Sequence, residues 1–386
     1  MDILYSGFDG LDLALKFNIS DDFASYLEAR QKGAEDARHD VCGEWSGQAF
    51  KVAATGGQGG YAFRIDTGLT GETWFLKRPT KRDPWGVRVS AKSAALLAHG
   101  LSGWQRKMEA TALAFGAAPE PGTVSIGRVD LAVDFLAPDF ILDDNAFVMP
   151  ARSNRKSIKE IMQTNGRSGR LTSVTVGKMP GRQVIVYDKR DEVFSKGKVE
   201  WLAAWNARRA ALGQPALDLA NPAASRVWRV EVRAGKQHLK KQWGVTSWTD
   251  LGVVLPHLVA GMMEKVRYCD PSSDSNRARW PIHPLWAMAT QTLTGLAADQ
   301  LPCISAETIR TATKAEKIDF LLNQSLGALT SIAALEEISP LAFDGYLEIL
   351  SKRLAVVSRH HRKDVARRLA EATERYSDLL EPTRQP

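Results

Sequence analysis

The sequence has few of the features that mark secreted, zinc-binding or membrane proteins. Only three cysteines (Cys42, Cys269 and Cys303) occur in 386 residues, and none lies close to another. This spacing argues against a disulfide framework and against a zinc site. No uninterrupted apolar run is long enough to cross a bilayer, and the first residues lack the basic region, apolar stretch and cleavage site of a signal peptide. We therefore expect a reduced, cytoplasmic protein without a membrane partner.

The composition is that of a soluble globular protein with a basic balance. The hydrophobic fraction of 44% and the charged fraction of 25% are ordinary, and a chain of this length predicts two or three domains. The formal net charge of +7 favours polyanionic partners without identifying one.

One stretch, residues 181–190 (GRQVIVYDKR), combines a β-strand pattern with a reactive side chain. Turn residues precede a β-branched run, which is typical of a strand. Because side chains alternate along a strand, Tyr187 should share one face with Lys189, while Val184 and Val186 face the other way. A tyrosine beside a cation is a candidate nucleophile, although a buried tyrosine more often only hydrogen-bonds a neighbour.

Two further stretches, residues 126–135 (IGRVDLAVDF) and 226–233 (RVWRVEVR), alternate in the same way. Asp130 and Asp134 take one face of the first, and Glu231 takes the polar face of the second. If the three strands share a sheet, these carboxylates converge with Tyr187 on one face. Oxygen ligands of this kind suit Mg²⁺ or Mn²⁺. The alternative is a solvated face with cross-strand ion pairs between arginines and carboxylates.

The ordered set of these three motifs resembles the Rep_trans family of rolling-circle replication initiators, and the match runs from about residue 124 to about residue 243. That family covers plasmid initiators, filamentous-phage replication proteins and relaxases of integrative elements. The resemblance implies that Tyr187 attacks DNA and that Asp130 and Glu231, with Asp134 less certain, hold the metal ion. It also implies that the protein acts as a dimer and recruits a host helicase.

The expected activity is that of a site-specific, topoisomerase-like DNA-nicking and strand-transferring endonuclease. Attack at an origin exposed as a single strand or hairpin would give a 5′-phosphotyrosine and a free 3′-OH, and the covalent bond would allow resealing. An unperturbed tyrosine has a pKa of about 10, so the phenolate needs help to form. Lys189, Arg229 and Arg233 are the candidates to stabilise the phenolate or the phosphate.

The expected fold is α+β, with mostly antiparallel sheets, packed helices and two similar strand–helix–strand halves. A catalytic domain would span residues 1–270, its N-terminal half covering about 1–135 and its tyrosine-bearing half about 170–265. A linker at 271–284 would lead into an all-helical region at 285–386. In finer detail, we expect a turn to divide the first strand and a loop or partly ordered arm between Asp143 and Leu171. Helix breaks are expected near Gly327 and near Ser339 and Pro340.

Three basic segments are candidates to bind DNA through phosphate contacts. The first is a loop beside two tryptophans, the second precedes the Tyr187 hairpin, and the third follows the Glu231 strand, where the resemblance places origin specificity. Solvated charged surfaces are the alternative at each. The candidate residues are Lys77, Arg78, Lys81, Arg82, Arg155, Lys156, Arg170, Lys236, Lys240 and Lys241.

Two other classes of function fit parts of the sequence. A non-catalytic DNA-binding regulator, a repressor or copy-control factor, would share the fold and the basic balance but would have no need of a tyrosine facing carboxylates. A structural or interaction protein would use the same strands only for ion pairs. Salt-sensitive DNA binding would exclude the latter.

Overall fold

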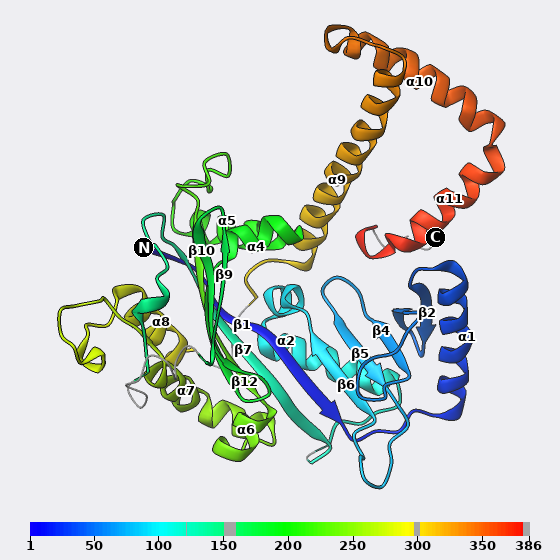
Figure 1. The fold of residues 1–386 in the computed structure, drawn as a ribbon. Coiled ribbons are helices and arrows are strands. Elements are labelled where there is room, and N and C mark those ends of the chain that lie inside the picture. Colours follow the sequence, from blue (N-terminus) through cyan, green and yellow to red (C-terminus); the bar gives the residue numbers. More distant parts are fainter. Residues whose placement is uncertain (121, 150–159, 297–301, 381–386) are drawn as a thin grey trace. The chain divides into compact units, whose positions relative to one another are not determined.

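A computed structural model describes residues 1–120, 122–149, 160–296 and 302–380 of the chain (Figure 1). The chain forms two compact units, Met1–Ile309 and Arg310–Pro386. The predicted linker at 271–284 lies inside the first unit, because the helix that follows it packs into the core of that unit. Arg155 and Lys156, two of the predicted DNA-binding residues, lie outside the described residues.

The first unit is built on an 11-stranded antiparallel sheet. A second sheet of two short strands, β8 (Phe147–Val148) and β13 (Arg267–Tyr268), lies apart from it in the pairing order. Together with the helices, these sheets confirm the predicted α+β class. The strands of the large sheet are β1 (Asp2–Leu15), β2 (Val41–Trp45), β3 (Gln48–Val52), β4 (Phe63–Asp66), β5 (Glu72–Leu76), β6 (Val87–Ala91), β7 (Val124–Leu136), β9 (Met162–Arg167), β10 (Arg170–Lys178), β11 (Arg182–Asp188) and β12 (Val227–Gly235).

The strand order repeats itself on the two sides of the sheet. Strands β1 and β7 pair at the centre, and the order outward is β6, β5, β4, β3, β2 on one side and β12, β11, β10, β9 on the other. In each half, the first strand in the chain is central and the last strand of the half pairs with it. Two similar strand arrays are therefore joined along β1 and β7. The second array begins with β7, which the expected N-terminal half of about 1–135 had included.

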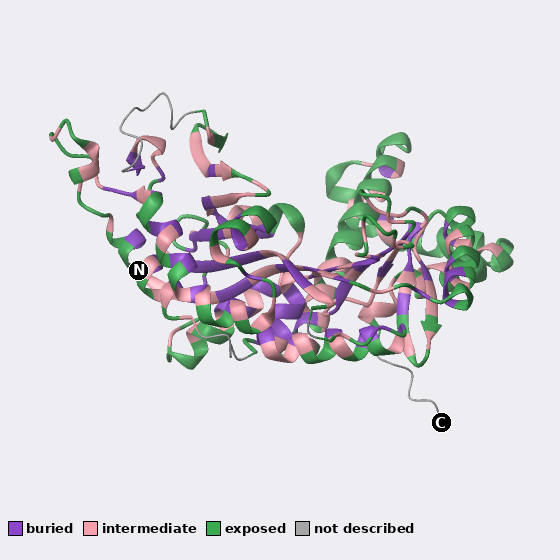
Figure 2. Ribbon diagram, turned by 90° about the horizontal axis from the view of Figure 1, so that it is seen from below, coloured by how far each residue is buried: buried purple, intermediate pink, exposed green. Residues whose placement is uncertain are grey.

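The two faces of the sheet are covered unequally. On one face, the apolar strand side chains form one large core with α1 (Asp21–Ala37), α2 (Ser93–Ala114), α6 (Lys236–Trp243), α7 (Trp248–Lys265) and α8 (Pro284–Thr294). A smaller core on the other face includes α5 (Glu200–Ala211) and Val193 of α4 (Lys189–Lys196). The central strands are accordingly buried, whereas the outer faces of the helices are exposed (Figure 2).

Two expectations about the strands are wrong. No turn divides the first strand: β1 is continuous, and its register against β7 shifts at three irregular points instead. The chain between Asp143 and Leu171 is not all loop, because β9 forms there and pairs with β10. Its polar sequence gave no strand pattern, and only pairing with a neighbour supplies its backbone hydrogen bonds.

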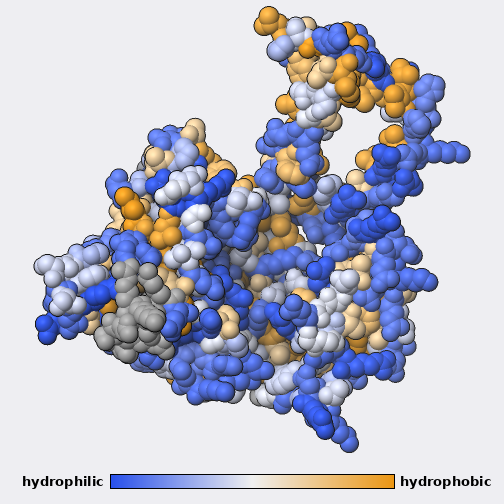
Figure 3. All heavy atoms as spheres, viewed as in Figure 1, coloured by the Kyte–Doolittle hydropathy of each residue, from blue (hydrophilic) through white to orange (hydrophobic). Residues whose placement is uncertain are grey.

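The second unit is helical. Helix α9 (Ala306–Leu335) continues through Gly327, so the expected break is absent, and α10 (Phe343–His360) and α11 (Arg362–Arg375) follow. By length and composition alone α9 is apolar enough to cross a membrane, and a single such helix is weak support for a span. The unit exposes apolar side chains, which contribute orange surface in Figure 3. They include Ile318, Leu322, Leu326, Leu335, Leu341, Ile349, Leu354, Val357 and Leu369.

Candidate active site

Tyr187 lies near the end of β11, on the face opposite the main core. The alternation predicted from sequence is present, since Val184 and Val186 pack in the core while Tyr187 faces away. Strand β11 pairs with β12 so that Tyr187 stands opposite Arg229 and Ile185 opposite Glu231. This register lets the Tyr187 hydroxyl donate a 3.0 Å hydrogen bond to Oε2 of Glu231.

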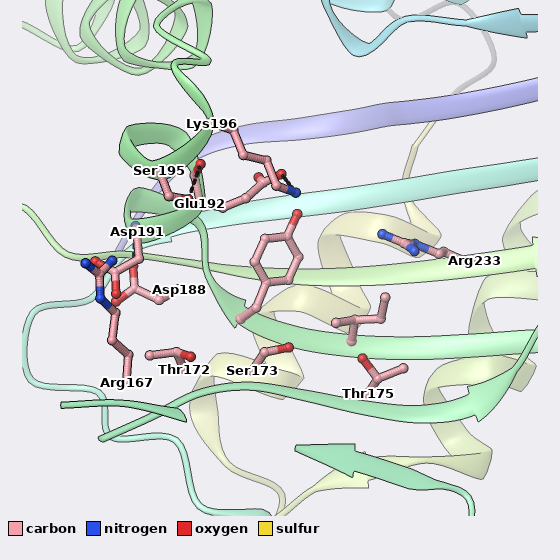
Figure 4. Close-up of a pocket in the computed structure, with 12 residues that line it drawn as sticks. Arg167, Thr172, Ser173, Thr175, Asp188, Asp191, Glu192, Ser195, Lys196 and Arg233 are labelled. Carbon is pink, nitrogen blue, oxygen red and sulfur yellow. Dashed lines mark hydrogen bonds and ion pairs between the residues drawn. The ribbon is translucent and has the colours of Figure 1, made fainter. Parts of the chain in front are cut away.

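A cavity of about 410 Å³ opens beside Tyr187. Its β10 wall contributes hydroxyl groups from Thr172, Ser173 and Thr175, and α4 contributes acidic and basic groups (Figure 4). Such a mixture of hydroxyl donors and charged groups is suited to a polar ligand. The lining residues are Arg167, Thr172, Ser173, Thr175, Ile185, Tyr187, Asp188, Asp191, Glu192, Ser195, Lys196 and Arg233.

Glu231 and Asp130 form the acidic part of the site, and both are buried. Nε of Arg233 lies 2.5 Å from Oε1 of Glu231 and 3.8 Å from Oδ2 of Asp130. Arg128 donates to both oxygens of Asp130, with Nε 2.8 Å from Oδ1. A Cβ at Gly10 would lie 2.9 Å from Oδ2 of Asp130, so β1 leaves room for this carboxylate only because it has glycine there.

Burial governs the acid–base properties of these groups. It raises the pKa of Asp130 to about 7, an effect that the nearby Glu231 charge increases and the Arg128 hydrogen bond opposes. Burial also raises the pKa of the Tyr187 hydroxyl well above its ordinary value, and Glu231 adds to the shift. The structure therefore holds Tyr187 as a neutral phenol that donates to the Glu231 side chain.

Asp134 and Arg229, two predicted site residues, belong to a closed network beneath the site. Both are fully buried. Nε and Nη2 of Arg229 bind the two oxygens of Asp134 at 2.5 and 2.8 Å, and Trp205 Nε1 donates to Oδ2 of Asp134 at 2.8 Å. Nη1 of Arg229 binds Asp9 at 2.7 Å. Both oxygens of Asp134 are thus engaged, and Arg229 is held by Asp134 and Asp9 and does not line the cavity.

Lys189 also differs from the expectation. The strand ends at Asp188, whose side chain caps α4, so Lys189 begins a helix and does not continue the alternation. Its ammonium lies 2.5 Å from Glu192 and 4.6 Å from the centre of the Trp201 ring. It is also 5.7 Å from the Tyr187 ring centre, so it does neighbour the phenol. Burial and the Arg229 charge lower the Lys189 pKa.

The described residues contain no group of three or more His, Cys, Asp or Glu side chains placed to hold a metal ion. Asp134 is unsuited to be a ligand, because Arg229 and Trp205, which hold its two oxygens, are fully buried. The oxygens of Asp130 and Glu231 are also engaged, but Arg128 and Arg233 are partly exposed and can give way to an ion. Asp130 and Glu231 remain, both facing Arg233. Since Mg²⁺ usually keeps several waters and takes only one or two carboxylates together with substrate phosphates, this pair fits such an ion.

The predicted basic segments are spread over the first unit. Arg170 binds Asp188 at 2.6 Å and Asp191 at 3.0 Å beside the cavity. Lys77 binds Asp83 at 2.7 Å, and Arg78 forms an exposed pair with Asp21. Lys81, Arg82, Lys236 and Lys241 are exposed, and Lys240 is half-buried.

Sequence patterns missed several members of the site. Asp9, Arg128, Glu192 and Trp205 reach it from four different elements, and Asp9 and Trp205 stand in none of the three motifs. The strict alternation of residues 126–135 did place Arg128 on the face of Asp130, so that residue alone had a usable signal.

No family model matches the chain, and no curated protein matches it significantly. Among solved structures, the chain is similar to a rolling circle replication initiator protein from Geobacillus stearothermophilus. The TM-score is 0.39 and the sequence identity is 15%, with 77% of this chain and 98% of that chain covered. A similarity at this level carries no activity across, so the function is argued from the site.

Proposed function

We propose that the protein initiates rolling-circle replication by nicking one DNA strand through tyrosine transesterification. The observation that carries this proposal is the hydrogen bond from Tyr187 to the buried Glu231 at the edge of a polar cavity. A carboxylate within 3.0 Å of the hydroxyl is within reach to accept its proton. The ordered resemblance of the three strands to Rep_trans initiators supports the same reaction.

In the proposed reaction, the Tyr187 oxygen attacks a DNA phosphorus. The bond from Tyr187 Oη to phosphorus forms and the bond from phosphorus to the 3′-oxygen breaks. The phenol proton passes to Glu231, and the leaving 3′-oxygen takes up a proton from water to become the free 3′-OH. The phosphodiester is retained as a 5′-phosphotyrosine, so attack by the 3′-OH on this phosphorus releases Tyr187 and reseals the strand.

Arg233 and Lys196 are the cations of the cavity lining suited to the phosphate. Arg233 is partly exposed and lines the same cavity as Tyr187, so it can meet a phosphate oxygen while it still contacts Glu231. Arg229 acts instead as a positioning residue, because it stands opposite Tyr187 in the register and is fixed by Asp134 and Asp9. Lys189 pairs with Glu192 within α4 and contacts α5 through the Trp201 ring, so it positions the one helix against the other.

Mg²⁺ or Mn²⁺ is the proposed cofactor, and Asp130 and Glu231 would hold it. Such an ion would offset the negative charge on the phosphate oxygens. The Glu231 charge adds to the raised pKa of Asp130, and in this structure Arg128 and Arg233 pair with the two carboxylates. The proposed partners are origin DNA as a single strand or hairpin, a second copy of the chain and a host helicase.

A non-catalytic DNA-binding regulator is the second candidate, and one observation favours it. Asp130, Asp134 and Glu231 are each paired with an arginine, and the pKa of Tyr187 is raised rather than lowered. A protein that only binds DNA would need no ionised tyrosine, so these ion pairs and a neutral Tyr187 are compatible with it.

One experiment separates the two candidates. The protein is incubated with Mn²⁺ and labelled supercoiled DNA that includes candidate origins, and denaturing gels reveal covalent protein–DNA adducts. An adduct that disappears in Tyr187→Phe establishes the nickase. Tight, salt-dependent binding of cognate origin DNA without an adduct establishes the regulator.

A further inference from the structure

The end of the sheet away from Tyr187 carries a cluster of ammonium groups around one indole ring. Nζ of Lys16 lies 5.2 Å from the centre of the Trp85 ring, and Nζ of Lys240 lies 5.5 Å from it. Lys236 stands one helical turn before Lys240 on α6. These distances fall within the range of a cation–π interaction.

The cluster joins elements from both halves of the first unit. Lys16 directly follows β1, Trp85 lies two residues before β6, and Lys240 lies on α6, which follows β12. All three strands reach the same end of the sheet at these points, because β1 is antiparallel to β6 and β7, and β7 is antiparallel to β12. The basic segments at residues 77–82 and 236–241, more than 150 residues apart in the sequence, therefore lie at the same end of the sheet.

The local charge is strongly positive. Burial, and after it the charges of Lys236 and Lys16, lower the pKa of Lys240, which reflects mutual repulsion of the ammonium groups. The carboxylate at the border of the cluster, Asp83, is within the electrostatic influence of Lys236 but is bonded at 2.7 Å to Lys77. The positive charges of the lysines near Trp85 are therefore not balanced by Asp83.

A second pair of aromatic rings continues the surface. Nζ of Lys77 lies 4.6 Å from the centre of the Tyr61 ring, and Tyr61 and Phe75 are 6.0 Å apart. Arg88, paired with Asp12 at 2.9 Å, covers Phe75 at 5.2 Å. Cations interleaved with aromatic rings are the usual composition of a surface that follows a nucleic-acid backbone.

The cluster is separate from the proposed nicking site. Arg229 stands level with Tyr187, and seven residues of chain separate it from Lys236, roughly 23 Å at about 3.3 Å per strand residue. Figure 1 shows α6 at the opposite end of the sheet from α4 and α5. Tyr187 and α6 lie on opposite faces of the sheet, so a DNA strand held at both sites would pass around the end or edge of the sheet.

We propose that Lys16 and Lys240, which lie over Trp85, and Lys236, one helical turn before Lys240, form a phosphate-binding site for the DNA backbone remote from the nick. The proposal rests on the proposed function only in taking DNA as the ligand. Phosphate contacts of this kind fix the position of the DNA and do not read its sequence. Because the site needs both halves, bound DNA would bridge them across the end of the sheet.

The test is DNA binding by the full chain as a function of salt, with a fluorescein-labelled mixed-sequence 30-mer used as a single strand and as a duplex. The triple variant K16Q/K236Q/K240Q should bind at least tenfold more weakly at low salt. The slope of log K against log salt should become shallower by about two to three, since each phosphate contact contributes about 0.7 for single strands and 0.9 for duplex. The form that loses more affinity is the form that occupies the site.

Two variants serve as comparisons. R30Q/K32Q removes exposed charges on α1 and should leave the affinity and the slope unchanged. Trp85→Ala should weaken binding more than Trp85→Phe, because phenylalanine keeps an aromatic face for the ammonium groups. Thermal unfolding of each variant confirms that it is folded.

The proposal is overturned if the triple variant keeps the affinity and salt slope of the parent protein for both DNA forms. Since the readout is binding and not nicking, it is independent of covalent adduct formation. If the triple variant loses binding and the parent protein forms no Tyr187 adduct, the nicking function is refuted and the phosphate-binding site is supported. If the parent protein forms an adduct and the triple variant binds DNA unchanged, the nicking function is supported and the phosphate-binding site is refuted.

Discussion

The hydroxyl of Tyr187 donates its hydrogen to Oε2 of Glu231, and Oε1 of the same carboxylate accepts from Arg233. One buried carboxylate thus connects the candidate nucleophile to a cation on the cavity wall. The arrangement places the proton acceptor, the nucleophile and a phosphate-binding cation on adjacent strands. It also makes each of them open to a separate test.

Replacing Tyr187 with phenylalanine should abolish nicking and covalent adduct formation while leaving DNA affinity within about twofold. The measurement is a denaturing gel for adducts with a parallel binding titration. Tyr268→Phe is the matched control, because the Tyr268 hydroxyl donates to the backbone oxygen of Ile141 at 3.2 Å within the core. Nicking that survives in Tyr187→Phe would rule out this nucleophile.

Glu231→Gln should reduce the nicking rate by about 10² to 10⁴, the range typical of a lost general base. Glutamine keeps the size and an oxygen that can accept from Tyr187, but it removes the charge. The reaction is measured at saturating DNA, so that weaker binding does not enter. Asp191→Asn, which changes a carboxylate elsewhere on the cavity wall, provides the comparison. Equal effects of the two substitutions would count against a specific role for Glu231.

Metal dependence should follow Asp130 and Glu231 and not Asp134. Asp130→Asn should weaken Mn²⁺ binding, measured by calorimetry, and EDTA should stop nicking by the parent protein. The arginines that engage Asp130 and Glu231 are partly exposed and can give way to an ion, whereas Arg229 and Trp205, which take both oxygens of Asp134, are fully buried. Full activity in EDTA would remove the metal from the mechanism.

The pair Asp134–Arg229 should dominate the stability of the site. Removing one partner leaves the other charge buried without its counter-charge, which typically costs about 3 to 5 kcal/mol. Arg229→Met should therefore lower the free energy of unfolding by an amount of this order in urea titrations. Arg367→Met breaks exposed pairs on α11 and should have no measurable effect. Similar losses of unfolding free energy in both variants would show that the buried Asp134–Arg229 pair stabilises the fold no more than an exposed ion pair.

His238 should make stability depend on pH. It is buried on α6, its Nε2 accepts from Trp243 Nε1 at 3.3 Å, and burial together with Arg182 lowers its pKa to about 4. The unfolded chain, with an ordinary pKa of about 6.5, binds this proton first. Its contribution is therefore complete above pH 6.5 and is lost as the pH falls towards 4.

Urea midpoints measured between pH 7 and pH 4 check this dependence. His238→Gln keeps an acceptor without a titrating ring, so its midpoint should fall less over the same interval. Parallel profiles for the parent and the variant would assign the acid sensitivity to other groups.

Much of the strand arrangement follows from the sequence alone. Strict alternation in residues 126–135 and 226–233 set which side chains share a face, and the turn before residue 181 located the Tyr187 strand. This was enough to place Tyr187, Asp130 and Glu231 on the side away from the core, because a period of two fixes the face of every residue in a strand.

Alternation does not fix which residues meet across strands, since that depends on register and on helices from distant parts of the chain. The register decided that Arg229 and Asp134 pair with each other, and α5 supplied Trp205 to close the pair. The end of β11 at Asp188 decided that Lys189 enters a helix.

Only the tertiary structure brought Lys16, Trp85 and Lys240 together, through contacts between segments far apart in sequence. The sequence by itself determined the class of fold and the polar face that bears the candidate nucleophile, because both follow from local periodicity. The pairing of charges on that face was decided by packing, because a buried charge takes whichever partner the folded chain brings within reach.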